Sequence, residues 1–220
     1  MKTRTERLHA AITAGAPVAL LGAMASHPHI PDLTDKAAVA AAAGAGATRW
    51  ALSHLAVGIA SALLLLALLA VCAWLGAAEG GRRSGRAVPL LVVGSTLFAF
   101  LPAIEIATLG AVEAGADPVA VQSAIERWFV PIMLASNLSF GLGIAVLARS
   151  LGSSGALPPR LAGVVVGALA LTAVTRFVPS TPALALGGIA AVVALWPLAL
   201  TMWRGGGPAA GPASGAPAHG

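Results

Sequence analysis

The stretch from Trp50 to Leu75, WALSHLAVGIASALLLLALLAVCAWL, contains no Asp, Glu, Lys or Arg. A helix rises about 1.5 Å per residue, so roughly 20 apolar residues cross a hydrocarbon core that is about 30 Å thick. This stretch is longer than that, and it therefore predicts a transmembrane helix.

Five further apolar runs are bounded by charged residues or by clusters of Pro and Gly. Backbone N–H and C=O groups in lipid must be paired internally, and repeated runs near 20 residues favour helices over a closed barrel. The sequence therefore predicts an all-α bundle of six transmembrane helices in a single domain, residues 1–204. The predicted spans are approximately Ala10–Ala25, Trp50–Leu75, Val88–Ala111, Trp128–Ala148, Leu161–Val178 and Ala183–Trp203.

The composition points the same way, since 58% of the 220 residues are hydrophobic and only 10% are charged. A net charge of +5 would suggest nucleic acid binding in a soluble protein, but nine of the thirteen Lys and Arg residues flank apolar runs. We therefore expect no nucleic acid partner. The expected partners are membrane lipids, a hydrophobic small molecule and a second copy of the chain. The Arg-rich, Ala-rich and Gly-rich composition suggests a bacterial origin.

The same cations predict the orientation of the helices. Nine of them lie on connections that share one side of the membrane, and four lie on the other side. The positive-inside rule places the nine in the cytoplasm, so both termini are expected there, with the protein in the inner (plasma) membrane. The nine are Lys2, Arg4, Arg7, Arg82, Arg83, Arg86, Arg149, Arg160 and Arg204.

The two ends of the chain differ from the predicted spans between them. Residues 1–25 combine a basic start with a short apolar run and Ala23-Met24-Ala25, a pattern also typical of a cleaved signal peptide. Cleavage would leave five spans. Residues 205–220 consist mainly of Pro, Gly, Ala and Ser without apolar periodicity, so we expect a disordered tail.

Asp117 followed by Pro118 is a helix-start signal, with Asp as the N-cap and Pro at the first helical position. The amphipathic stretch that follows ends at Trp128. We expect a short separate helix lying at the membrane interface there.

Small residues within the spans indicate where helices approach closely. Gly163 and Gly167 have the GxxxG spacing in the fifth span. The other candidates, in the fourth and sixth spans, are Gly141, Gly143, Gly187 and Gly188.

Ionisable groups inside a membrane are costly, so each needs a partner or a cavity. Counted from the centres of their spans, Glu105 and Arg176 lie at matching depths toward the outer side, with His54 nearer the surface and Asn137 near the middle. One interpretation is a structural ion pair between Glu105 and Arg176. The other is an outward-facing polar pocket in which Glu105 donates or accepts a proton.

A second candidate is a metal site at His27 and His29, followed by Asp32 and Asp35 just after the first span. Histidine nitrogens with carboxylates suit Zn, Ni or Cu(II). His54 is a further candidate ligand from the second span.

Several classes of membrane protein are disfavoured. The chain has no GxxxxGK[ST] loop, no HExxH and no serine-protease signature, and its spans lack the mid-membrane histidines that paired haem ligation needs. The single cysteine, Cys72, excludes an internal disulfide. No cofactor is therefore predicted.

Three functional hypotheses remain. The first is an intramembrane enzyme that uses acid/base chemistry to cyclise or isomerise a lipid-like or isoprenoid substrate. The second is a small proton-coupled or metal-ion secondary transporter, and the third is an accessory protein without catalysis. The candidate catalytic residues for the first are Glu105 and Glu113 as acids, with Arg176, His54 and Asn137 as orienting groups.

Overall fold

The computed structural model describes residues 3–79 and 83–206, and the regular structure in these residues is entirely helical. Of the expected disordered tail, only Gly205 and Gly206 lie among the described residues. The helices are α1 (Arg4–Ser26), α2 (Lys36–Ala45), α3 (Ala47–Glu79), α4 (Ala87–Glu113), α5 (Pro118–Ser153), α6 (Pro159–Val174) and α7 (Thr181–Arg204), with 3-10 helices η1 (Ser84–Arg86) and η2 (Thr175–Phe177).

Every α-helix except α2 is long and apolar enough to cross a membrane, which makes six candidate spans in the described part of the chain. Each of the six predicted spans overlaps one of these helices, although α1 and α5 begin well before the predicted starts at Ala10 and Trp128. The prediction of an all-α, six-helix membrane bundle is therefore confirmed, and the chain is a multi-pass membrane protein.

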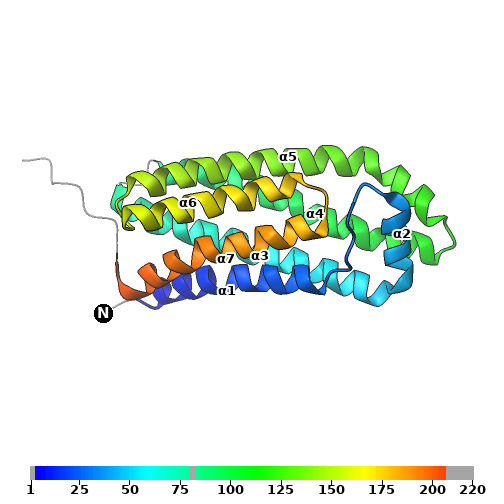
Figure 1. Ribbon diagram of the computed structural model, residues 1–220, viewed down its shortest axis with the longest axis horizontal. Coiled ribbons are helices and arrows are strands. Elements are labelled where there is room, and N and C mark those ends of the chain that lie inside the picture. The colour runs from blue at the N-terminus through cyan, green and yellow to red at the C-terminus, as the bar shows by residue number, and fades with distance from the viewer. Residues whose placement is uncertain (1–2, 80–82, 207–220) are drawn as a thin grey trace, which may run out of the picture.

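The six long helices lie side by side along the longest axis of the molecule (Figure 1). Helices that follow one another in the chain pack together, and α1 also packs against α7, so the arrangement closes into a ring. α1 buries Ala10, Thr13 and Ala16 in this ring. Cleavage of the first segment as a signal peptide would remove one wall of the bundle.

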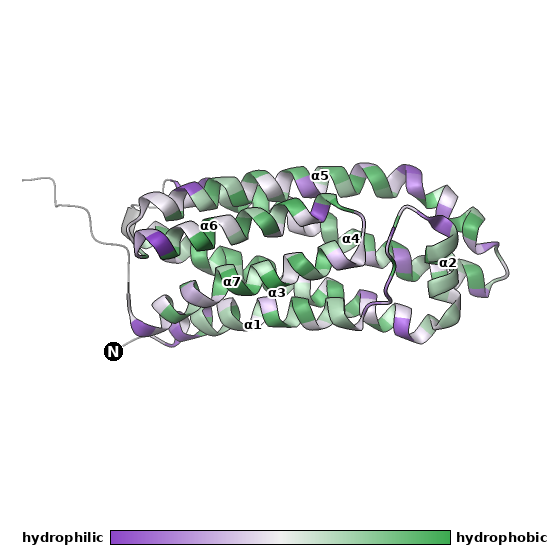
Figure 2. Cartoon of the chain, in the orientation of Figure 1, coloured by the Kyte–Doolittle hydropathy of each residue, from purple (hydrophilic) through white to green (hydrophobic). Residues whose placement is uncertain are grey.

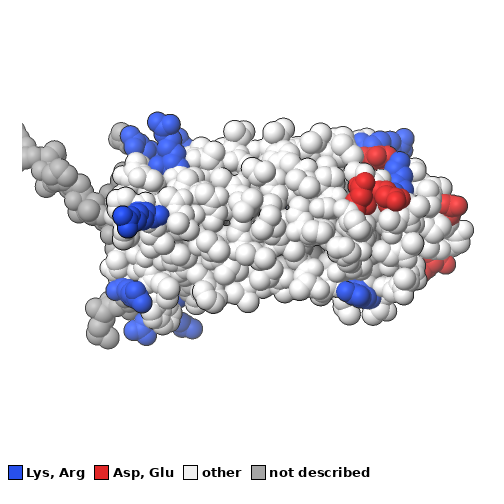
Figure 3. All heavy atoms as spheres, in the orientation of Figure 1, with Lys and Arg blue, Asp and Glu red and all other residues white. Residues whose placement is uncertain are grey.

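Charge separates the two ends of the bundle (Figure 3), while the middle of the long helices is mainly hydrophobic (Figure 2). We call the end where α1 begins and α7 ends the basic end, defined by Arg4, Arg7, Arg83, Arg86, Arg149, Arg160 and Arg204. The opposite, acidic end carries Asp32, Asp35, Glu113, Asp117 and Glu126 together with Lys36, Arg49 and Arg127.

The long helices differ in length, and the difference appears at the acidic end. α6 with η2 covers 19 residues, whereas α3 has 33 and α5 has 36. Figure 1 shows α3, α4 and α5 extending past the connection between η2 and α7. The bundle therefore has more helices around its middle than around its acidic end.

α2 lies across these extended ends and contacts α3 and α5 (Figure 1). The carboxylate of Asp35 caps it, accepting hydrogen bonds from the backbone N–H groups of Ala37 and Ala38 at 3.0 and 3.1 Å. Lys36 then makes an ion pair with Glu126 of α5, with 2.6 Å between Nζ and Oε2. This helix was not predicted from the sequence.

The expected separate interfacial helix after Asp117 is wrong. Asp117 does cap a helix, accepting from the N–H of Ala120 at 2.8 Å, with Pro118 at the first helical position. That helix continues without a break through Trp128 and Pro131 to Ser153. The helix start at Asp117 was therefore predicted correctly. The segment that follows it packs against α4 and α2 and forms the first part of the transmembrane helix α5.

The glycine predictions are partly wrong. A Cβ added at Gly141, Gly163 or Gly167 would meet no atom within 4 Å, so these glycines do not mark close helix contacts. Gly143 lies against Leu91, as expected of a packing glycine. Gly187 and Gly188 also pack closely, against Thr175 and Leu21.

The closest backbone approach was not predicted and lies between α4 and α5. A Cβ at Gly94 would lie 2.5 Å from the backbone nitrogen of Phe140. The hydroxyl of Ser136 also donates to the carbonyl oxygen of Gly94 at 2.8 Å. These contacts fix the position of α4 along the axis of α5.

Toward the basic end, the bundle is filled by a packed apolar cluster. Leu75, Leu91, Leu147 and Leu198 are fully buried members from four different helices, and Cys72 is buried among them. This half of the molecule provides stability and positions the more polar half.

We expect Gly94→Ala to lower the free energy of unfolding by about 1–3 kcal/mol, because the added methyl group overlaps the backbone of α5. Gly163→Ala is the matched control, since the same methyl group meets open space, and it should change stability by less than about 1 kcal/mol. Thermal unfolding of both variants in the same detergent measures the difference. Equal melting temperatures for the two variants would contradict the close approach.

Candidate functional site

A cavity of about 210 Å³ lies between the helices at the acidic end. Its walls are mainly apolar and include Leu101, Phe129 and Met133. A cavity of about 150 Å³ in another protein admits benzene, so this one can hold a small apolar group or part of a lipid chain. The ionisable and amide side chains in its walls are His27, Lys36, His54, Glu105, Gln122, Glu126 and Arg176.

Glu105 of α4 is held by a neutral partner. Its Oε2 accepts a hydrogen bond from the side-chain amide of Gln122 at 3.1 Å. Gln122 comes from the first turns of α5, which reach this level only because α5 is extended. No cation makes an ion pair with Glu105 among the described residues. The carboxyl group therefore lines the cavity without a salt bridge.

Arg176 of η2 lies between two aromatic rings. Its guanidinium carbon is 4.1 Å from the ring centroid of Phe98 and 4.1 Å from that of Phe140. Its Nη2 donates to the hydroxyl of Ser136 at 3.3 Å. Its Nε is buried and has no hydrogen-bond acceptor within the described structure.

The hypothesis of a structural ion pair between Glu105 and Arg176 is wrong, and so are the matching depths. Phe98, which packs on the guanidinium, lies seven residues before Glu105 on α4. At about 1.5 Å per residue, the backbone of Glu105 lies roughly 10 Å nearer the acidic end than that of Phe98. The predicted depths were counted from the centre of each span. They were wrong because the centres of the spans lie at different levels in the bundle.

His27 and His54 form a second polar group in the cavity wall, with Trp50. Their Nε2 atoms lie 3.4 Å apart. The ring centroid of Trp50 is 4.4 Å from that of His54 and 5.6 Å from that of His27. His54 was predicted as an orienting group and as a further candidate ligand near His27, and the structure does bring these two histidines together.

The backbone decides which nitrogen of each histidine carries hydrogen. Nδ1 of His27 lies 2.9 Å from the carbonyl oxygen of Pro28, and Nδ1 of His54 lies 2.8 Å from that of Trp50. A carbonyl oxygen only accepts, so each Nδ1 is the donor. In the neutral rings both Nε2 atoms are then acceptors that face each other. The neutral pair therefore presents two acceptor nitrogens to a hydrogen-bond donor.

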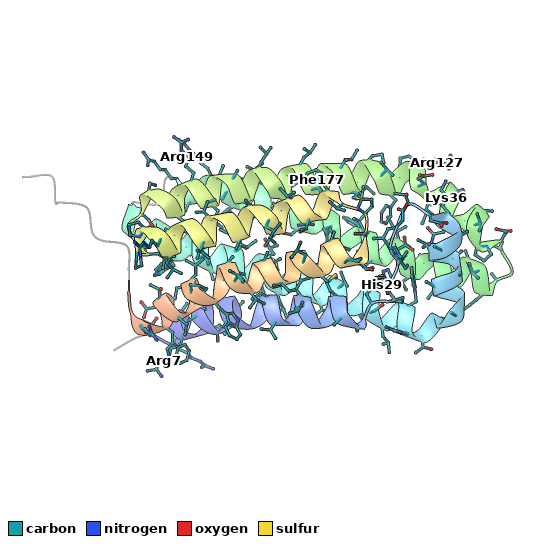
Figure 4. All side chains as sticks on the ribbon, viewed as in Figure 1. Arg7, His29, Lys36, Arg127, Arg149 and Phe177 are labelled. Carbon is teal, nitrogen blue, oxygen red and sulfur yellow. The ribbon has the colours of Figure 1, made fainter. Side chains whose placement is uncertain are left out.

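His29 does not join this pair. Its Nδ1 lies 3.5 Å from the hydroxyl of Thr181, and it is not part of the cavity wall. Figure 4 shows His29 near the start of α7. The described residues contain no group of three or more His, Cys, Asp or Glu side chains arranged to hold a metal ion. The metal site at His27 and His29 therefore stays a prediction.

The remaining two candidates lie outside the cavity wall. Glu113 is the last residue of α4, beyond the cavity toward the acidic end. Asn137 is buried, and its side-chain amide donates to the backbone carbonyl of Arg176 at 2.7 Å. Asn137 therefore positions the segment that carries Arg176.

The site is covered at the acidic end by α2 and the segment before it. Lys36 and Glu126, which form the ion pair between α2 and α5, both line the cavity. Figure 4 shows Lys36 at this end, far from Arg7 and Arg149. Sequence reasoning missed this cover, and it also missed Gln122, Ser136 and the two phenylalanines around Arg176.

Comparison with protein-family models, curated proteins and solved structures finds no match to this chain.

Protonation of His27 provides a test of the burial of this site. Burial lowers the pKa of His27 from its ordinary value of 6.5, the contact with Pro28 opposes this, and the nearby Arg49 guanidinium lowers the pKa further. The unfolded chain then binds the proton more readily than the folded protein does. Stability should therefore fall as the pH falls below about 6.5.

We expect the melting temperature of the wild type to drop between pH 7.5 and pH 5, and the drop to be smaller in His27→Gln. His29→Gln, in the same segment but outside the cavity wall, is the control and should behave as the wild type. An unchanged pH dependence in His27→Gln would show that His27 is not buried as described.

Proposed function

We propose that the protein is an intramembrane enzyme that uses acid/base chemistry to isomerise or cyclise a lipid-like substrate in the cavity at the acidic end. The observation that carries this proposal is the carboxyl group of Glu105, which lies in a mainly apolar cavity with a neutral amide partner and no ion pair among the described residues. A carboxyl group with no cation beside it and an apolar substrate site is the minimum that proton transfer to a hydrocarbon requires.

The reaction needs an acid and a base, and the cavity wall supplies both. Protonated Glu105 donates its proton to one carbon of a double bond, and positive charge develops on the other carbon. Nε2 of His27 or His54 removes a proton from a neighbouring carbon, so the double bond moves and the molecular formula is unchanged. The imidazolium then gives its proton to water at the cavity mouth, and water returns a proton to Glu105, so both groups are restored and no oxidant or reductant is consumed.

The aromatic side chains in the walls support the charged intermediate. Trp50 and Phe129 both line the cavity. The face of an aromatic ring attracts a cation, which favours a carbocation near these rings. Cyclisation uses the same steps when a second double bond of the substrate attacks the cation.

The position of the cavity favours chemistry on a bound molecule over passage across the membrane. The packed cluster that contains Leu75, Leu91 and Leu147 fills the half of the bundle toward the basic end. A transported ion would have to cross this apolar half. A substrate that enters and leaves at the acidic end would not.

Exchange of hydrogen with solvent tests the proposal without a known substrate. The protein in lipid nanodiscs is incubated in D₂O with farnesol, farnesoic acid, oleic acid and a bacterial lipid extract, and deuterium in the lipids is measured by mass spectrometry. We expect the wild type to place deuterium on carbon. Glu105→Gln should reduce the rate about 100-fold or more, since general acid catalysis contributes roughly 10²–10⁴-fold.

Glu113→Gln is the matched control, because it makes the same change on the same helix outside the cavity wall. It should keep the rate of the wild type. Full exchange in a folded Glu105→Gln variant would remove Glu105 from the mechanism. No carbon-bound deuterium in any lipid with the wild type would sink the proposed activity.

A further inference from the structure

The guanidinium of Arg176 has no anionic partner in the described structure. It belongs to a membrane-spanning segment, where an uncompensated charge is costly. Two ring faces and one hydroxyl contact it, and none of these carries a negative charge. A negatively charged group from outside the described structure must therefore pair with this guanidinium in the functional protein.

The acidic side chains of the site are already accounted for. Glu126 pairs with Lys36, and Glu105 accepts from Gln122 roughly 10 Å nearer the acidic end. A smaller cavity of about 40 Å³ on the other side of Arg176 has hydroxyl groups in its walls but no Asp or Glu. The hydroxyls of Ser61 and Thr175 donate to carbonyl groups of their own helices.

The guanidinium also keeps unused donors. Nε is buried without an acceptor, while Nη2 makes only the long contact to Ser136. Arg176 lines both cavities, so a ligand in the large cavity can contact its side chain. Planar oxygen groups such as carboxylates and phosphates fit this fork of N–H donors, and charge assistance makes the contacts strong.

We propose that the ligand of the large cavity is an acidic amphiphile, with a carboxylate or phosphate monoester bound by Arg176 and an apolar chain directed toward Glu105. This assignment rests on the proposed function and gives its substrate a chemical class. Phe98 and Phe140 both pack on the guanidinium, which restricts its movement at the cavity wall.

The proposal also fixes which part of the ligand reacts. The head group lies at the level of Phe98, and Glu105 lies roughly 10 Å further along α4. The reacting double bond is then about this distance from the head group. Leu101 and Pro102 line the wall between the two positions, which suits a hydrocarbon chain.

Three radiolabelled probes separate the parts of this proposal in a scintillation proximity assay on the protein in zwitterionic nanodiscs. Dodecanoate has the head group and the chain, dodecanol has only the chain, and acetate has only the head group. We expect dodecanoate to bind at least about tenfold more tightly than either of the others. Dodecyl phosphate then shows whether a phosphate monoester is preferred to the carboxylate.

Arg176→Gln should weaken dodecanoate binding about tenfold or more and leave dodecanol binding unchanged. Arg176→Lys keeps the charge but not the planar fork, so it should give an intermediate loss and covers the case in which Arg176→Gln does not fold. Arg127→Gln is the matched control, because Arg127 lies outside the cavity wall beside Trp128.

Each binding result tests a different part of the proposal. Equal binding of dodecanoate and dodecanol to the wild type overturns the acidic amphiphile and leaves a lipid-like substrate in place. Acetate binding as tight as that of dodecanoate makes this a site for free small anions, which also overturns the proposal. Binding of none of the probes, together with the absence of deuterium exchange, removes the proposed function itself.

Discussion

The thickness of the hydrocarbon core is the constraint on which this structure depends. α6 with η2 rises about 30 Å, which matches that thickness, whereas the 36 residues of α5 rise about 54 Å. The connection between α5 and α6 at the basic end is short, so the excess of α5 lies at the acidic end. The cavity, its cover and Gln122 all occupy the volume that this excess creates.

The bundle was largely predictable from the sequence, because length and hydropathy are properties of each helix alone. The level of one helix relative to its neighbour is not a property of either helix alone. It is set by contacts such as the one between Ser136 and Gly94, which are hydrogen bonds and close packing between helices. For this reason all six spans were found in the sequence, while Glu105 and Arg176 were placed at one depth, with an ion pair between them as one of two interpretations.

The partners of the site residues escaped prediction for a related reason. Gln122 belongs to a stretch that resembles an interfacial helix until α4 is placed beside it. Phe98 and Phe140 are ordinary apolar residues in their own spans, and only the fold puts Arg176 between them. The signal for α2 was present in Asp35 and the alanines that follow, but its role as a cover depends on the extended helices beneath it.

The polar groups of the site lie at different depths along the bundle. The cation lies deepest, among aromatic rings, and the acid lies nearer the acidic end with a neutral amide partner. The histidine pair presents two acceptor nitrogens from α3 and the segment after α1. Acid, base and cation come from different elements, so the complete ring of helices is needed to bring them to one cavity.

The cover formed by α2 is held by two kinds of contact of unequal strength. The Lys36 to Glu126 ion pair is about half exposed, and such pairs contribute only about 0–1 kcal/mol and weaken in salt. Val39 and Ala43 of α2 are instead buried in a small apolar cluster with Trp50 and Leu109. Apolar contacts of this kind are not screened by ions. Closure of the site is therefore governed by hydrophobic packing, so it persists across wide changes in ionic strength outside the bundle.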